Sequence, residues 1–225
     1  MHDPRLEVLY EDNHLLALNK PAALATMGVS ADVPSLLSLA RDYIKHRYKK
    51  PGNVYLGAMS RLDAPVTGVV LFARTSKAAA RLTEQFRGRS VEKAYWAIVA
   101  GGLPKPAEEC VDWIRKDERH RRMHLAGEGQ AGAQLARLRY RRQRQVDGGW
   151  LLQIELATGR KHQIRLQLSA RGFPVLGDRK YGSRESFASG IALHSRRLVF
   201  EHPTRGEAIV LEAPLPAAWQ RFGLE

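Results

Sequence analysis

The feature that most constrains the fold is an apolar run in the first third of the chain, from Val69 to Ala73. Five consecutive residues without a polar side chain, placed between Gly68 and Arg74, are typical of a strand that is covered on both faces. A strand of this kind needs the packed layers of an ordered domain. The 225 residues, of which 44% are hydrophobic, suffice to bury a substantial core.

The rest of the chain shows helical and strand patterns that do not alternate regularly. Helices are expected over 34–50, where Ser35 can cap the first turn, and over 75–88, where Thr75 or Ser76 can do so. The other expected strands are a hairpin over 6–24 and segments over 93–101, 150–159, 191–203 and 207–216. We therefore expect an α+β fold around a mainly antiparallel or mixed central sheet with flanking helices.

The segment 158–173 fits two patterns. Apolar residues alternate from Ile164 to Leu168 as in a strand, whereas the length and the closing Gly172 suit a helix with a C-terminal glycine. The residues alone leave both alternatives open.

The chain shows no sign of a boundary between domains. No internal repeat is visible, and no linker is long or rich in glycine and serine. We therefore expect residues 1–225 to form a single domain, and two closely joined lobes within it are compatible with the pattern.

The composition points to a polyanionic partner. The formal net charge is +13 and the sequence pI is near 10.2, which suits nucleic acid or an anionic membrane surface; nucleic acid is the better match. No apolar run approaches the roughly 20 residues of a membrane-spanning helix, and the first residues lack a signal-peptide pattern. We therefore expect a cytoplasmic protein with no membrane partner.

The chain offers few thiols or metal ligands. Cys110 is the only cysteine, so an intrachain disulfide and a multi-cysteine zinc site are excluded, and its acidic neighbours disfavour a thiolate. His120 and His124 have the spacing of a helical metal pair, but cationic neighbours and the lack of a third ligand argue against it. No metal site is expected.

Basic residues are concentrated between Arg115 and Arg144, a segment that contains ten lysines and arginines. If its second half is a strand, Arg137, Arg139 and Arg141 project from one side and form a face that can bind phosphates. The alternative is an ordinary solvated face, which is what most charge runs are.

The absence of common motifs restricts the chemistry. No phosphate-binding P-loop, dinucleotide-binding fingerprint or HExxH motif is present, so a reaction would have to run on side chains alone. Asp63 suits such a reaction because an ionised carboxylate can act at the anomeric carbon of a sugar. The alternative is a turn aspartate held by Arg61 or by backbone N–H groups.

The segment SRLDAPVTGVVLFAR, residues 60–74, resembles the central motif of the RluA-type family of pseudouridine synthases. Further matching blocks follow the order of the family: an N-terminal block at 8–24, a tyrosine-bearing strand at 92–101, a T-G-R-x-H-Q-I-R block at 157–182, and C-terminal segments at 193–203 and 212–216. The match covers nearly the whole chain. Together these blocks are far more specific than a lone R-L-D.

The resemblance implies a catalytic site without metal or cofactor. Asp63 matches the catalytic aspartate, which acts at C1′ of a uridine while the bond from N1 breaks; the uracil then turns and is rejoined through C5. Tyr95 matches the tyrosine that lies against the target base, and Arg165 the arginine that keeps the carboxylate ionised and oriented. Without the resemblance, Tyr95 suits a buried position on a strand and Arg165 a place on the surface.

The resemblance also implies contacts with the RNA. Arg61 matches an arginine that takes part in displacing the target base, and Leu193 lines the uracil pocket. Lys20 and Lys93 are candidate cations of the cleft, with solvated surface lysines as the alternative. The resemblance favours a helix within 158–173, whose positive terminus suits phosphate. The expected substrate-binding residues are Arg61, Leu193, Arg137, Arg139, Arg141 and Arg160.

Two features depart from the family pattern. Ser60 stands where a histidine or glycine is usual, and Pro65, Val66 and Thr67 replace a more polar sequence. The family often carries an N-terminal S4 RNA-binding domain, whereas this chain begins directly at the catalytic block. RNA binding is therefore expected from the catalytic domain itself.

The leading hypothesis is an RNA pseudouridine synthase, an isomerase that acts on ribosomal or transfer RNA as a monomer without an obligatory protein partner. Its rival is a non-catalytic RNA-binding protein or RNA chaperone on the same fold, suggested by the altered turn after Asp63. A DNA-binding protein is a weaker third candidate, because a flipped single base and a 2′-hydroxyl suit RNA better.

Overall fold

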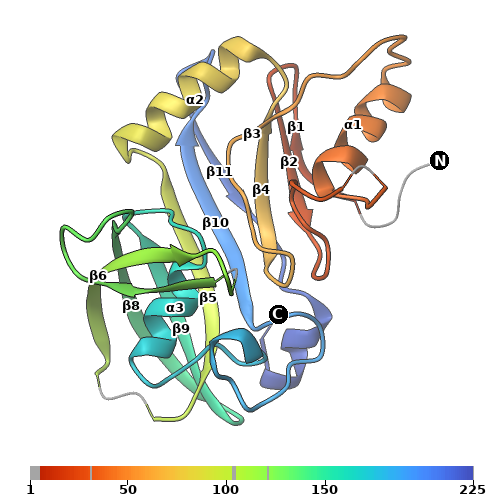
Figure 1. Ribbon diagram of the computed structural model, residues 1–225. Coiled ribbons are helices and arrows are strands. Elements are labelled where there is room, and N and C mark those ends of the chain that lie inside the picture. Colours follow the sequence, from red (N-terminus) through yellow and green to blue (C-terminus); the bar gives the residue numbers. More distant parts are fainter. Residues whose placement is uncertain (1–5, 31, 103–104, 121, 225) are drawn as a thin grey trace. The chain divides into compact units, whose positions relative to one another are not determined.

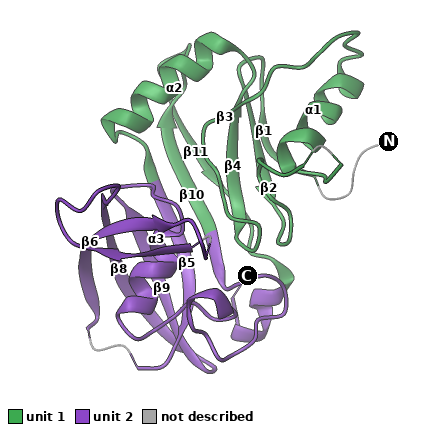
Figure 2. Ribbon diagram, in the orientation of Figure 1, with its two compact units in different colours: residues 1–92, 195–217, 225 green, residues 93–194, 218–224 purple. Residues whose placement is uncertain are grey.

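The computed structural model describes residues 6–30, 32–102, 105–120 and 122–224. It divides into two compact units (Figure 2). Described residues up to 92 and 195–217 form unit 1, and described residues of 93–194 and 218–224 form unit 2. Each unit has its own strands and helices.

Unit 1 is built on strands that surround the apolar run (Figure 1). These are β1 (Glu7–Glu11), β2 (Leu15–Lys20), β3 (Gly57–Ala58), β4 (Thr67–Ala73), β10 (Leu193–Glu201) and β11 (Ala208–Glu212). Their order is β1-β2-β4-β10, with β3 beside β4 and β11 beside β10. The β1–β2 hairpin and the antiparallel β10–β11 pair confirm the expectations for 6–24 and for the C-terminal strands.

The central strand β4 is the one that the apolar run predicts, and every residue in it is buried. Its alternate residues Val69 and Leu71 join Ala78 and Leu82 of the second helix in one core cluster. The expectation of a strand covered on both faces is confirmed.

Two helices flank these strands, and Figure 1 shows them on opposite sides. They are α1 (Leu36–Arg47) and α2 (Ser76–Gly88). The Ser35 hydroxyl accepts the N–H of Ser38 at 3.2 Å, and the Ser38 hydroxyl accepts the N–H of Ser35 at 2.9 Å, which completes a capping box. Thr75, rather than Ser76, caps α2.

Unit 2 contains an antiparallel sheet. Its strands are β5 (Glu92–Ala100), β6 (Ala107–Asp117), β7 (Arg122–Ala126), β8 (Gln134–Val146) and β9 (Gly149–Leu156), in the order β5-β9-β8-β6-β7. Neighbouring strands pair antiparallel throughout this order. The strands expected near 93–101 and 150–159 are β5 and β9.

The ambiguous segment 158–173 forms a helix, α3 (Gln163–Ala170). The buried Gln167 amide nitrogen donates to the carbonyl oxygens of Cys110 at 3.2 Å and Ala136 at 3.3 Å, so α3 packs against β6 and β8. Two 3₁₀ helices complete the described elements, η1 (Arg179–Tyr181) and η2 (Ala217–Phe222). The protein has the expected α+β fold with a central sheet and flanking helices.

Candidate active site

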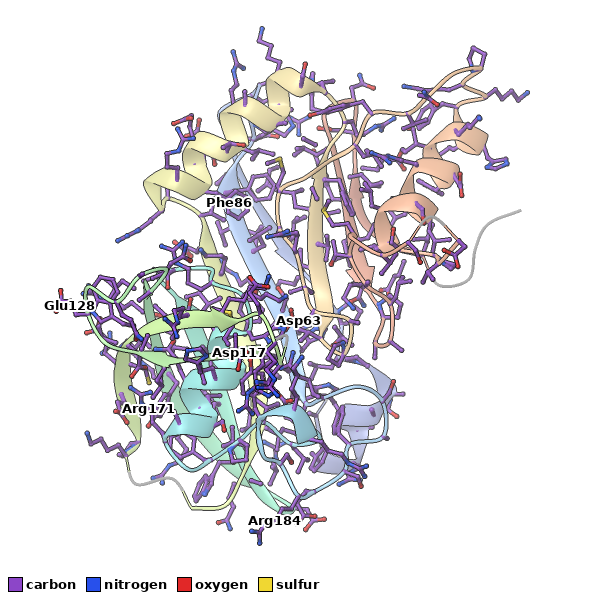
Figure 3. The ribbon with its side chains drawn as sticks, viewed as in Figure 1. Asp63, Phe86, Asp117, Glu128, Arg171 and Arg184 are labelled. Atoms are coloured by element: carbon purple, nitrogen blue, oxygen red, sulfur yellow. The ribbon has the colours of Figure 1, made fainter. Side chains whose placement is uncertain are left out.

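Asp63 lies on a short turn that leads into β4 (Figure 3). We call residues 62–66 the Asp63 turn. Its backbone closes when the N–H of Val66 donates to the carbonyl oxygen of Asp63 at 3.0 Å. Leu62 and Val66 are buried while Asp63 itself is half-buried. The turn is therefore anchored at both ends and keeps its carboxylate accessible.

The start of the Asp63 turn is held by Thr26, which is 3% exposed. The Thr26 hydroxyl donates to the carbonyl oxygen of Leu62 at 2.9 Å and accepts the N–H of Leu62 at 3.0 Å. One side chain thus satisfies both backbone groups of the residue before Asp63. This fixes the backbone from which the carboxylate projects.

Lys20 holds the other side of the Asp63 turn. Its ammonium donates to the carbonyl oxygens of Pro21 at 2.8 Å, Leu24 at 2.7 Å and Ala64 at 3.1 Å. The side chain is fully buried, so the alternative of a solvated surface lysine is wrong for Lys20. Burial lowers the pKa of Lys20 to about 7, and the nearby Asp63 carboxylate acts in the opposite direction.

This burial predicts a pH dependence of stability. In the unfolded chain Lys20 has its ordinary pKa of 10.5, against about 7 in the fold. Between these values the unfolded state holds a proton that the folded state lacks, so raising the pH favours folding, by up to about 1.4 kcal/mol per pH unit. We expect Lys20→Met to remove this rise in the free energy of unfolding, measured by urea denaturation from neutral to mildly alkaline pH.

A matched control is Lys77→Met, which changes an exposed lysine on α2. Its free energy of unfolding should follow the same pH dependence as the unmodified protein. If Lys20→Met also followed it, Lys20 would titrate normally and its burial would have no electrostatic consequence.

Arg165 belongs to α3 and forms a buried ion pair within unit 2. Its Nε and Nη2 donate to the two carboxylate oxygens of Asp178 at 2.6 and 2.9 Å, and both side chains are nearly inaccessible to water. The guanidinium also lies over the ring of Tyr181, 5.0 Å from its centroid. A bidentate pair fixes the plane of the guanidinium, so Asp178 and Tyr181 determine how Arg165 is oriented.

The start of α3 is already occupied by internal hydrogen bonds. The side-chain oxygen of Gln163 accepts the hydroxyl of Thr158 at 2.7 Å and the backbone N–H of Arg160 at 3.0 Å. The Arg160 side chain is exposed, and its Nε donates to the carbonyl oxygen of Leu135 at 3.2 Å. A phosphate at this helix terminus would thus contact the guanidinium of Arg160, because the backbone N–H of Arg160 is already bonded to Gln163.

Tyr95 lies on β5, and the strand register shows which face it occupies. Tyr95 is opposite Ile154, and Ile154 is opposite Tyr140, so these residues share one face of the unit 2 sheet. The buried Ala136, next to α3, also belongs to this face. Tyr95 therefore projects from the face that carries α3, the helix of Arg165.

The arginines of β8 project from the opposite face. Arg137, Arg139 and Arg141 are exposed and alternate with buried residues, as the pattern predicts. From the sequence we expect these arginines to bind RNA beside the catalytic aspartate, and this stays a prediction; within unit 2 the register places them on the face opposite Tyr95. Arg139 also stands directly between Glu109 and Glu155 of the neighbouring strands, which offset its charge. Arg121 of the same basic segment lies outside the described residues.

The structure also locates the other expected residues. Arg61 is exposed at the entrance to the Asp63 turn, Lys93 is half-buried on β5, and Leu193 is buried at the first position of β10. Unit 1 therefore brings Arg61 and Lys20 together with Asp63. The remaining expected residues belong to unit 2.

The structure shows the surroundings of the cysteine and of the two histidines considered as metal ligands. Burial raises the pKa of the Cys110 thiol to about 12, which makes a thiolate nucleophile unavailable at neutral pH. His124 lies on β7 rather than on a helix, and His120 pairs with Asp117 at 2.7 Å. Within the described residues, no three metal-ligating side chains gather and no helix could cross a membrane.

Three residues that orient the site are not recognisable from the sequence, namely Thr26, Asp178 and Tyr181. Asp178 and Tyr181 fall within the block at 157–182, but their contact with Arg165 spans a loop and depends on the fold. Thr26 lies in a segment without any pattern that points to the Asp63 turn.

Comparisons with known proteins show the family to which the chain belongs. The family model described as RNA pseudouridylate synthase matches residues 14–170. The dual-specificity RNA pseudouridine synthase RluA of Escherichia coli K12 is 32% identical over 94% of this chain and 94% of its own length. An RNA pseudouridine synthase of Bacillus subtilis, YhcT, described as uncharacterised, is also 32% identical, over 94% of this chain and 69% of its own.

A solved structure gives the same result for the fold. Human RNA pseudouridylate synthase domain containing 4 superposes with a TM-score of 0.79 at 25% identity, over 97% of this chain and 93% of the other. Fold and sequence similarity thus define a class of enzymes that modify RNA. The chain belongs to the RNA pseudouridine synthase family, and its relatives of similar length include the RluA enzymes.

Proposed function

We propose that the protein isomerises uridine to pseudouridine in structured ribosomal or transfer RNA, with Asp63 as the catalytic carboxylate. The observation that carries this proposal is the Asp63 turn, where Thr26 and Lys20 hold the backbone on both sides of one accessible carboxylate. The family to which the chain belongs indicates the reaction, the conversion of uridine to pseudouridine in RNA. The turn supplies a carboxylate in a fixed place.

The reaction conserves all atoms of the nucleotide. The bond from C1′ to N1 breaks while Asp63 acts at C1′, as nucleophile or as counter-charge to the developing cation. The detached uracil turns and forms a bond from C5 to C1′. The proton at C5 then leaves and N1 gains one, so the product is an isomer.

Residues of unit 2 are proposed to contact the target base and to keep the catalytic carboxylate ionised. Tyr95 lies against the target base and takes part in the proton transfer from C5. By the family resemblance, the role of Arg165 is to keep the catalytic carboxylate ionised, while Asp178 and Tyr181 orient Arg165. Leu193 lines the uracil pocket. From unit 1, Arg61 helps to displace the target base from its stack.

The test of this function is direct. The purified protein is incubated with total cellular RNA, and pseudouridine is mapped with and without the protein. New pseudouridine at defined positions supports the proposal and identifies the RNA. Salt-dependent RNA binding without any conversion would support the non-catalytic alternative.

We further propose that the protein is a cytoplasmic monomer that needs no protein partner. Its net charge of +13 is compatible with direct binding to RNA.

The exposed face of β8 predicts a contribution to RNA affinity. We expect the triple variant Arg137→Gln, Arg139→Gln, Arg141→Gln to bind RNA more weakly by a similar factor for all sequences, because phosphate contacts carry affinity and little sequence information. Each lost contact should lower the magnitude of the log-log salt slope by about 0.7 to 0.9. Conversion at saturating RNA should survive, because these side chains face away from Tyr95.

The matched control for β8 changes its carboxylate neighbours, Glu109→Gln with Glu155→Gln. This pair should strengthen binding if the arginines contact phosphate, since it removes the offsetting charges. An unchanged affinity and salt slope in the triple variant would show that the face is only solvated.

A further inference from the structure

A second basic surface lies on unit 1, on α1 and the loop that follows it. A hollow of about 410 Å³ is lined there by Arg41, Asp42 and Lys45 of α1 and by residues 52–54 of the loop. Arg41 and Lys45 are four residues apart, so they lie on the same side of the helix, about 6 Å apart along its axis. Val54 is the one apolar side chain among the lining residues.

The cations of this surface belong to α1 and to the residues that directly follow it. Within the part of the chain that the structure describes, Arg41, Lys45, Lys49 and Lys50 form no ion pair. Elsewhere, by contrast, Arg87 pairs with Glu84 at 2.8 Å, and Arg205 with Glu207 at 2.7 Å. Arg47, on the same helix, lies 3.5 Å from Glu11. All four cations are exposed, and Asp42 carries the only carboxylate among the residues that line the hollow.

We propose that this hollow, the α1 hollow, binds the phosphate backbone of the RNA substrate. Two cations one helical turn apart can contact phosphates of one strand, and charged and backbone groups line the hollow rather than the apolar side chains typical of a small-molecule site. Tyr55, next to the lining residues, is 51% exposed and offers a ring on which a base can stack.

This inference rests on the proposed function for the identity of the ligand, and it adds a second place of contact. The α1 hollow is made by α1 and its loop, whereas the Asp63 turn is a separate segment. Its cations should therefore contribute to affinity and leave the chemical step unchanged. They should also matter for a long RNA and not for a short oligonucleotide that occupies the catalytic site alone.

The test is a salt titration of binding, measured by fluorescence anisotropy with a labelled ribosomal RNA fragment. For Arg41→Gln with Lys45→Gln we expect at least about fivefold weaker binding and a salt slope reduced in magnitude by about 1.4 to 1.8, the effect of two lost phosphate contacts. A labelled trinucleotide containing uridine should bind as before. The matched control removes two cations of α2, Lys77→Gln with Arg87→Gln, and should change the slope much less.

The outcomes separate this inference from the proposed function. Equal effects of the two double variants would show a general response to net charge and overturn the α1 hollow as a binding surface. If Arg41→Gln with Lys45→Gln weakened binding to phosphatidylserine vesicles and left RNA binding unchanged, the α1 hollow would be a membrane contact and the inference would be overturned. Pseudouridine formation is measured independently, so a protein that makes no pseudouridine but loses RNA affinity in the α1 variant would contradict the function and retain this inference.

Discussion

Replacing Asp63 with asparagine is expected to abolish pseudouridine formation and to leave the fold intact. Asparagine has nearly the same shape as aspartate, and the Asp63 turn is held through backbone atoms, so the turn should persist. An amide supplies neither a nucleophile nor a negative charge at C1′. We expect a fall of about 10⁴-fold or more, the scale on which loss of an essential catalytic group acts.

The measurement is pseudouridine formed per enzyme in RNA, with the thermal unfolding midpoint and RNA affinity measured in parallel. Asp147→Asn, at an exposed turn of unit 2, is the matched control and should retain full activity. Product formation by the Asp63 variant near the level of the control would falsify the assigned role. Loss of the fold would instead place Asp63 among the structural residues.

The second large effect is expected from Asp178→Asn. The Asp178 carboxylate and the Arg165 guanidinium are 1% and 6% exposed, so removing the carboxylate leaves a buried cation without its bidentate partner. Breaking a buried pair in this way costs about 3–5 kcal/mol of unfolding free energy. The freed guanidinium should also lose its orientation, so we expect kcat to fall more than KM changes.

Urea denaturation measures the loss of unfolding free energy in Asp178→Asn, and Glu212→Gln is the control variant. Glu212 pairs with Arg197 at 3.5 Å on the surface, and such a pair contributes only about 0–1 kcal/mol. Asp178→Glu keeps the charge and should recover part of both stability and kcat. Equal stabilities for Asp178→Asn and Glu212→Gln would contradict the structural account of the Arg165 pair.

Much of the fold is predictable because it is encoded locally. The apolar run before Arg74 identifies β4, and Ser35 and Thr75 mark the starts of α1 and α2 through their own hydrogen bonds. In the segment 158–173, by contrast, alternation of apolar residues competes with helical length. Burial decides between them, because every residue from Gln163 to Leu168 is covered whichever way it points, and a period-two pattern then carries no information.

The site is predictable to a smaller extent, because its supports come from distant segments. Asp63 stands out by its own neighbours in sequence, whereas Lys20 lies 44 residues from Ala64 and Thr26 lies 36 residues from Leu62. The arginines of β8 show a related limit. Alternation predicts that Arg137 and Arg139 are exposed together, but only pairing with β9 shows which side of the sheet they occupy.

The supports of the Asp63 turn reach main-chain atoms and not side chains. Thr26 bonds the N–H and carbonyl of Leu62, and Lys20 bonds the carbonyl of Ala64, so neither contact depends on which residue follows Asp63. The side chain at position 64 and the ring of Pro65 can therefore diverge without moving the carboxylate. The Asp63 turn therefore separates two tasks: its buried anchors fix the main chain, and the side chains at positions 64 and 65 take no part in these hydrogen bonds.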